Sequence, residues 1–164
     1  MNTYPLVFGC REVVAGENFT AAIDIAGRAL LEFDGDEWTV AGVDPGGLAD
    51  CGSTAQEAYE HFRLTLKSVL FDCADANPKD FEAFCSAVRS FGATKNVATE
   101  ALWEAARQEI KQGAQLNEPF AAALPKRTSA ILASVEIVRL DVPSSDLRAQ
   151  TNVVAANENL AAAA

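Results

Sequence analysis

Alternating apolar and polar positions predict β-strands in the first third of the chain. Every second residue from position 19 to position 25 is apolar, namely Phe19, Ala21, Ile23 and Ile25, which is the period of a strand with one buried face. The alternation resumes in residues 28–33 and 37–43, and Asp34-Gly35-Asp36 separates these two runs. Because an Asp-Gly pair between alternating runs is typical of a tight turn, we expect a β-hairpin here.

Two flanking segments extend the expected sheet. Residues 6–14 form an earlier strand or, alternatively, an edge segment interrupted by Gly9. Asp44-Pro45-Gly46-Gly47 is a turn sequence and should end the third strand. We therefore expect a small antiparallel sheet of three or four strands.

The period changes after Gly52, and the new spacing predicts a long helix. Thr54 and Glu57 have the spacing of a capping box, in which the Thr54 hydroxyl accepts the Glu57 amide and the Glu57 carboxylate accepts the Thr54 amide. Apolar residues then follow at intervals of three and four, giving a stripe that can lie on the sheet: Ala58, Tyr59, Phe62, Leu66, Val69, Leu70 and Cys73.

Two shorter helices and a late strand complete the predicted domain. Asn77 is the expected cap of a second helix, with Pro78 at its first position and an apolar stripe up to Phe91. Residues 95–112 predict a third helix on the stripe Ala98, Ala101, Leu102, Ala105, Ala106 and Ile110, stopped by Gly113. Residues 115–126 are expected to form a connector, and residues 134–142 a strand whose two faces are both partly apolar.

Together these elements predict a single α+β domain over residues 1–142, followed by a flexible tail over residues 143–164, with a weak helix as the alternative for the tail. The length of 164 residues suits one domain.

The chain has no run of 18 apolar residues and no basic start followed by an apolar stretch, so we expect neither a membrane span nor a secretory signal. A cytoplasmic protein with reduced thiols is expected.

Charge and composition narrow the classes of function. The formal net charge is -10, and residues 1–91 carry 15 acidic and 6 basic side chains, which makes that half strongly acidic. Nucleic acid is not an expected partner, because phosphate binding is driven by Lys and Arg. With one histidine and four cysteines that lack CxxC spacing, no metal site is expected. We also expect no cofactor.

A motif in the middle of the chain points to a family. The hairpin is followed by a Pro-Gly turn and then by a glycine, a threonine and a Glu-Ala pair that open a helix: Pro45, Gly46, Gly52, Thr54, Glu57 and Ala58. In this order of elements, residues 19–76 resemble the HicB-type antitoxins. The resemblance implies a small antiparallel sheet with one helix across it, related to partial ribonuclease-H-like folds, with residues 77–142 as a helical extension and late strand. It also implies a noncatalytic antitoxin that neutralises a small basic toxin ribonuclease.

Five acidic residues are the expected contact surface for such a partner: Asp34, Asp36, Glu37, Asp44 and Asp50. The simplest alternative is that the hairpin acids only decorate a solvated turn. A second alternative is a metal-dependent hydrolase, for which several of these acids would have to converge around a metal. No catalytic residue is predicted, because no nucleophile or base belongs to a recognisable motif.

The remaining expectations concern association and the thiols. A third alternative for the function is a homo-oligomeric structural protein without a toxin partner. We expect a homodimer through residues 134–142, since an unpaired strand edge invites pairing with another chain. The alternative is that this strand pairs inside its own sheet and the protein stays monomeric. Cys51 is expected to be a loop thiol and His61 an exposed residue, whereas Cys73 and Cys85 fall on helix stripes and should lie in the core.

Overall fold

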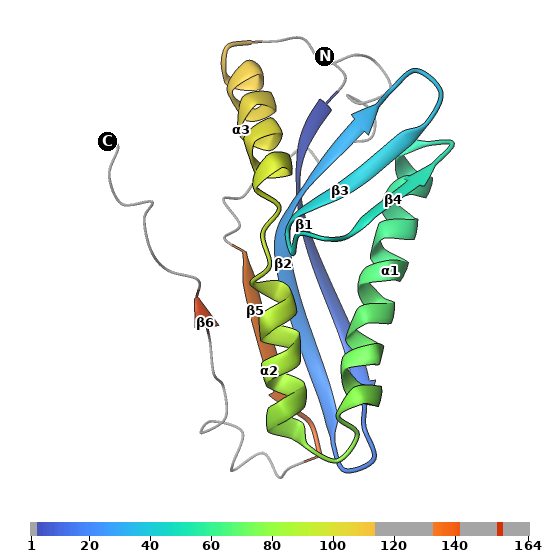
Figure 1. Cartoon of the computed structure of the whole chain (residues 1–164), viewed down its shortest axis with the longest axis vertical. Coiled ribbons are helices and arrows are strands. Elements are labelled where there is room, and N and C mark those ends of the chain that lie inside the picture. Colours follow the sequence, from blue (N-terminus) through green and yellow to red (C-terminus); the bar gives the residue numbers. More distant parts are fainter. Residues whose placement is uncertain (1–2, 114–132, 142–153, 156–164) are drawn as a thin grey trace.

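The computed structural model describes residues 3–113, 133–141 and 154–155. Its elements (Figure 1) are β1 (Thr3–Ala15), β2 (Thr20–Phe33), β3 (Trp38–Asp44), β4 (Ala49–Gly52), α1 (Ala55–Ala76), α2 (Phe81–Gly92), α3 (Val97–Lys111), β5 (Ser134–Arg139) and β6 (Val154–Ala155). The predicted α+β class is confirmed. The described strands form one antiparallel sheet of six strands rather than the three or four predicted, because the late strand β5 joins the sheet and the short strands β4 and β6 were not expected. The two alternating runs in residues 19–33 form the single strand β2.

Strand β2 is the centre of this sheet. On one side it pairs with β1 along its length, from Thr3 opposite Glu32 to Ala15 opposite Thr20. On its other side β2 pairs first with β5, over residues 21–26, and then with β3, over residues 28–33. The late strand thus lies inside the sheet of its own chain. Val142, the last residue of the predicted strand, lies outside the described residues.

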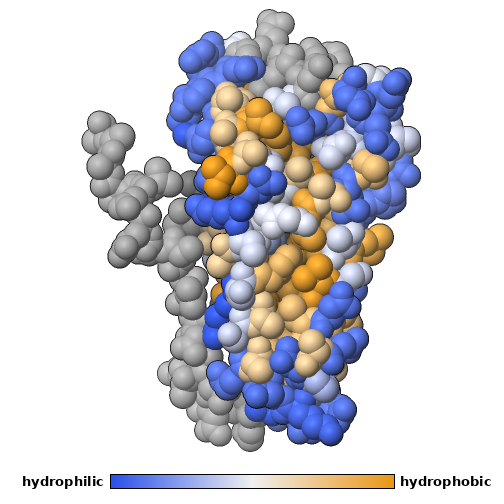
Figure 2. Space-filling view, viewed as in Figure 1, coloured by the Kyte–Doolittle hydropathy of each residue, from blue (hydrophilic) through white to orange (hydrophobic). Residues whose placement is uncertain are grey.

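The two faces of the sheet are covered by different helices. Alternate residues of β2, from Ala21 to Leu31, face the main core together with buried residues of α1 and α2, such as Phe62 and Phe84. Figure 2 shows apolar side chains gathered between these two helices, with hydrophilic side chains toward the ends of the molecule. Leu30 points to the opposite face, where it packs with Trp103 of α3 in a second, smaller core.

Helix α1 begins where the sequence predicts. Thr54 is its N-cap, and the Thr54 hydroxyl accepts a hydrogen bond from the Glu57 amide at 3.1 Å. The return bond differs from the prediction, because the Glu57 carboxylate accepts the amide and the hydroxyl of Ser53 rather than the amide of Thr54. These two bonds to the charged form hold the pKa of Glu57 below its ordinary value.

Thr54→Ala should lower the free energy of unfolding by about 1 kcal/mol, the typical cost of losing an N-cap side chain. Urea denaturation followed by circular dichroism measures this. Ser68→Ala is the matched control, because Ser68 is exposed in the middle of the same helix and alanine is the better helix former there. Equal stability of the Thr54→Ala variant and the unmodified protein would contradict the capping role.

The predicted start of the second helix is wrong. Helix α2 is capped by Asp80, whose side chain accepts the Ala83 amide at 3.0 Å. Asn77 instead ends α1 and donates to the Cys73 carbonyl. The Pro78 carbonyl accepts the amide of Glu17 in the β1–β2 turn at 2.7 Å, so the chain around Pro78 is held as a loop against that turn.

Two further predictions fall wholly or mainly outside the described residues. The connector over residues 115–126 lies entirely outside them. Of the predicted tail over residues 143–164, the structure describes only Val154–Ala155, which form the short strand β6 against β5 rather than a helix or a free tail.

Candidate functional site

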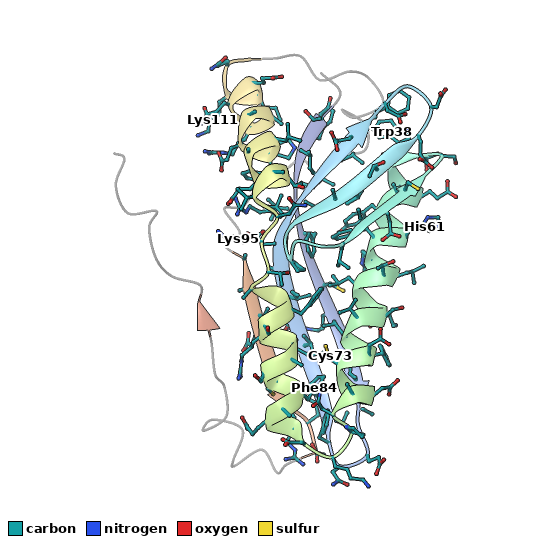
Figure 3. All side chains as sticks on the ribbon, viewed as in Figure 1. Trp38, His61, Cys73, Phe84, Lys95 and Lys111 are labelled. Atoms are coloured by element: carbon teal, nitrogen blue, oxygen red, sulfur yellow. The ribbon has the colours of Figure 1, made fainter. Side chains whose placement is uncertain are left out.

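The β2–β3 turn presents three carboxylates at the surface. Gly35 has a φ of 113°, which glycine adopts without strain. The Asp34 carboxylate accepts the amides of Asp36 and Glu37, each at 3.0 Å, and these bonds lower the pKa of Asp34. Below the turn, the rings of Phe33 and Trp38 pack with centroids 4.7 Å apart. Figure 3 labels Trp38 at this end of the molecule.

Asp34, Asp36 and Glu37 are all exposed, and together we call them the acidic corner. Within the described part of the chain, none of the three carboxylates forms an ion pair, although ion pairs with Lys or Arg occur at several other acids. Among the residues that the structure describes, no cation compensates these three negative charges at one turn. Such a surface attracts a basic partner and repels an acidic one.

The thiol of Cys51 borders the acidic corner. Cys51 belongs to β4 rather than to a loop, lies opposite Thr39 in the β3–β4 register and is exposed. A hydrogen bond with Glu37 and its negative charge raise the pKa of the Cys51 thiol above the ordinary value. The Cys51 carbonyl lies 2.8 Å from Nδ1 of His61, so the exposed imidazole labelled in Figure 3 ties α1 to β4.

Glu37→Gln should lower the pKa of Cys51 and speed its alkylation, because a neutral side chain no longer disfavours the thiolate. The rate of iodoacetamide modification of the Cys51 peptide is measured across a pH series by mass spectrometry. The variant should show a profile shifted to lower pH. Asp75→Asn, the same change of charge at the far end of α1, should leave the profile in place. An unshifted Glu37→Gln profile would show that this carboxylate does not interact with the thiol.

Asp50 lies apart from the acidic corner. In the β3–β4 register it is opposite Val40, which is buried on the face covered by α1. Its side chain therefore points to the opposite face of β4 from that of Cys51. Asp50 is partly buried, and its Oδ2 atom is buried without a hydrogen bond to any described residue.

Asp44 does not have the exposure that a partner contact requires, because it is only 4 % exposed. Its carboxylate accepts the Arg28 amide at 2.8 Å and three bonds from the Arg28 guanidinium, the shortest at 2.7 Å to Oδ2. The structure thus assigns Asp44 to an internal ion pair between β2 and β3. Of the five predicted contact residues, the structure brings together three.

The Arg28–Asp44 pair is part of a larger cluster that holds α3 on the sheet. The Arg28 guanidinium also donates to Glu100 at 2.6 Å and lies 5.1 Å from the centroid of the Trp103 ring. Burial opposes the charge of Arg28, but its hydrogen bonds with Asp44 and Glu100 raise its pKa overall. The sequence did not predict this cluster, since Arg28 lies 72 residues before Glu100 and no motif links it to Glu100 or Trp103.

The Pro-Gly turn after β3 also has a structural role. The Gly46 amide donates to the Thr94 carbonyl at 2.9 Å, and the Asn96 amide donates to the Val43 carbonyl at 3.0 Å. A Cβ atom on Gly46 would lie 2.3 Å from the Asn96 nitrogen, so only glycine permits this approach. The turn therefore anchors the link between α2 and α3.

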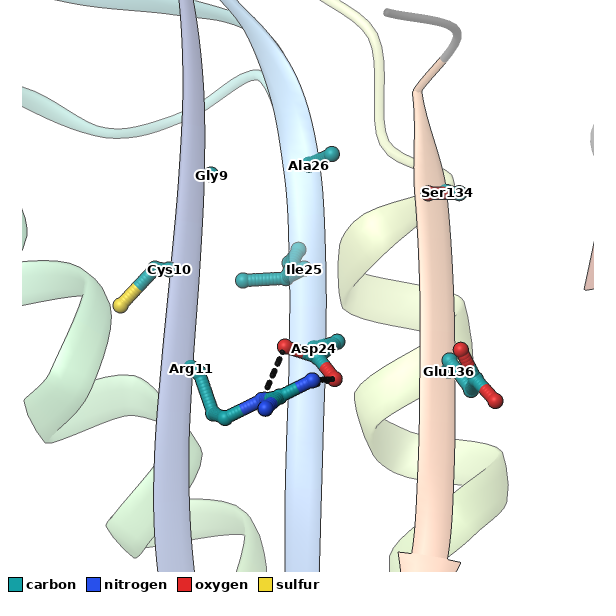
Figure 4. Close-up of a pocket in the computed structure, with 8 residues that line it drawn as sticks. All are labelled: Gly9, Cys10, Arg11, Asp24, Ile25, Ala26, Ser134 and Glu136. Atoms are coloured by element: carbon teal, nitrogen blue, oxygen red, sulfur yellow. Dashed lines mark hydrogen bonds and ion pairs between the residues drawn. The ribbon is translucent and has the colours of Figure 1, made fainter.

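The face of the sheet that carries α3 is called the outer face, and the face that carries the main core is called the inner face. A shallow pocket of about 400 Å³ lies on the outer face, between β1, β2 and β5 (Figure 4). Arg11 and Asp24 face each other across β1 and β2 and form a bidentate ion pair at its floor. Within the described residues, no group of three His, Cys, Asp or Glu side chains has a geometry that could hold a metal ion.

Comparisons with protein-family models, with curated proteins and with solved structures each find no match for this chain. None of the described helices combines the length and the apolar character that crossing a membrane requires.

Proposed function

We propose that the protein is a noncatalytic, cytoplasmic binding module of the HicB type, and that its acidic corner contacts a small basic protein. The observation that carries this proposal is the set of three exposed carboxylates at Asp34, Asp36 and Glu37, which have no compensating cation among the described residues. A toxin ribonuclease is the class of partner that the resemblance implies. Asp44 and Asp50 are left out of the proposed contact surface.

The contacts within the hairpin support a role in recognition. The two amide bonds to Asp34 and the ring contact between Phe33 and Trp38 fix the turn before any partner arrives. A pre-ordered surface loses less conformational entropy on binding. Its concentrated negative charge also speeds the approach of a basic protein, an effect that salt weakens.

The arrangement around the hairpin supports the proposal. The antiparallel pair β2 and β3 leads into the Pro45-Gly46 turn, and Thr54 caps the helix that crosses the sheet. The later helices are additions to this unit. In the proposal they serve to support the sheet, since α2 covers its inner face and α3 its outer face.

Affinity purification from the native cell, followed by mass spectrometry, tests the proposal. The unmodified protein should enrich a small basic protein, and the purified pair should dissociate more readily as salt is added. Asp36→Asn combined with Glu37→Gln should weaken the binding of that partner by about tenfold or more. Asp34 is left unchanged in this variant because its carboxylate shapes the turn.

Asp72→Asn combined with Asp75→Asn is the matched control. It removes the same two charges from an exposed part of α1, remote from the acidic corner, and should leave affinity within about twofold of the unmodified protein. Enrichment of no basic protein, or equal binding by both double variants, would overturn the proposed contact surface.

A further inference from the structure

One edge of the long strand β1 pairs with no other strand that the structure describes. Among the described strands β1 pairs only with β2, in a register without interruption. Thr20, opposite Ala15, accepts the Leu140 amide, so the Thr20 backbone is turned toward β5 and away from β1. Because the direction alternates along a strand, every second residue of β1 directs its backbone groups away from β2. The last four of these residues are Gly9, Arg11, Val13 and Ala15, and we call these four the β1 free edge.

The β1 free edge lacks the features that usually keep a strand edge from pairing. All four residues are exposed, and their backbone groups have no hydrogen-bond partner among the described residues. This part of β1 contains neither a proline nor a bulge. Both charged side chains in this part of β1 form ion pairs within the same chain. Arg11 pairs with Asp24 of β2 (Figure 4), and Glu12 pairs with Lys67 of α1.

Apolar side chains border the β1 free edge on both faces of the sheet. On the outer face Val13 is 55 % exposed, and Gly9 leaves the backbone bare. On the inner face α1 runs beside β1 (Figure 1), held there by the Glu12–Lys67 pair. This helix exposes Leu64 by 61 % and Phe71 by 38 %, about two turns apart on one side.

We propose that the β1 free edge is the interface with a second copy of this chain, so that two sheets join edge to edge and two α1 helices lie side by side. A second copy is favoured over a basic partner because the charged side chains of this part of β1, Arg11 and Glu12, are already paired within the chain. The strand therefore offers a partner backbone groups and apolar side chains rather than a free charge. A two-fold axis would place β1 antiparallel to the β1 of the second copy. Two-fold symmetry is the commonest symmetry of soluble oligomers.

This inference replaces residues 134–142 as the expected dimer contact, because β5 pairs within its own sheet. It does not depend on the acidic corner, which lies on the β2–β3 turn rather than on β1.

Light scattering of the full-length protein across the micromolar range tests the proposal. The unmodified protein should have the mass of a dimer. Val13→Pro removes an outward amide without removing a bond to β2, and edge positions of this kind accept proline. It should raise the dissociation constant of the dimer by about tenfold or more. Val13→Thr keeps the amide and the β-branched shape and should remain a dimer.

A second pair of variants does not touch the strand. Leu64→Lys combined with Phe71→Lys places like charges on the two α1 helices and should also weaken the dimer by about tenfold or more. Leu102→Lys, a similar change at an exposed residue of α3, should have no effect. A monomeric mass for the unmodified protein would overturn the proposal, as would a dimer that survives both in folded Val13→Pro and in the double lysine variant.

Hydrogen exchange locates the interface directly. The amides of Gly9, Arg11, Val13 and Ala15 should be protected in concentrated samples and should lose protection on dilution. Protection that does not change with concentration would show that another part of the same chain covers the edge, and it would overturn the proposal.

Discussion

Asp44→Ala should lower the free energy of unfolding by about 3 kcal/mol, near the lower end of the cost of breaking a buried ion pair. The substitution removes the acceptor of the Arg28 amide and of three guanidinium bonds. The Arg28 side chain is only 17 % exposed, so water replaces these bonds poorly. Glu100 still neutralises part of the Arg28 charge, which keeps the loss at the lower end. Urea denaturation at neutral pH gives the measurement.

The chain contains a matched control for this experiment. Arg11 and Asp24 also face each other on neighbouring strands and form a bidentate pair. Their side chains are 74 % and 39 % exposed, so Asp24→Ala should cost less than about 1 kcal/mol. Equal losses in the two variants would contradict the view that burial makes the Arg28–Asp44 pair costly to break.

The local elements of the fold could be predicted because their causes are local. The Asp34-Gly35-Asp36 turn and the alternating positions beside it are enough to define the β2–β3 hairpin. Thr54 and the stripe that follows are enough to start α1, since an N-cap acts on amides within the first turn. The acidic corner was predictable for the same reason, because residues in a tight turn are exposed.

The position of Asp44 could not be predicted, because it depends on a bulge. From Phe33 opposite Trp38 to Ala29 opposite Gly42 the hairpin register is regular, and its continuation would place Val43 opposite Arg28. The bulge shifts the pairing by one residue and places Asp44 there instead. A shift of one residue exchanges the faces of a strand. Nothing in the local pattern of apolar residues marks this shift.

The orientation of α3 differs from the prediction for a similar reason. The predicted stripe of residues 98–110 places Leu102 inside, but Leu102 is 50 % exposed, and the buried residues of α3 are Thr99, Trp103 and Ala106. The helix is rotated so that Glu100 reaches Arg28 and Trp103 covers Leu30. Long-range contacts of this kind outweigh a weak stripe that consists mainly of alanines.

Trp103→Ala should be the most destabilising of the substitutions considered, with a loss of about 3–5 kcal/mol in the free energy of unfolding, as is usual for a buried tryptophan. Trp103 is 8 % exposed, is central to the smaller core, and donates from Nε1 to the Leu6 carbonyl at 3.0 Å. Leu102→Ala, at the neighbouring exposed position, should change stability by less than about 0.5 kcal/mol. Similar losses in the two variants would show that α3 does not pack through Trp103.

The loss in Trp103→Ala should be concentrated in α3. The main core, which includes Phe62 and Phe84, lies on the other face of the sheet and keeps its contacts. Amides of α3 should therefore exchange with solvent faster, while the exchange of α1 amides should follow only the global loss.

Because Asp44 and Trp103 both act through Arg28, the double variant Asp44→Ala/Trp103→Ala should lose less stability than the sum of the single losses. Additive losses would show that the ion pair and the aromatic ring hold α3 independently.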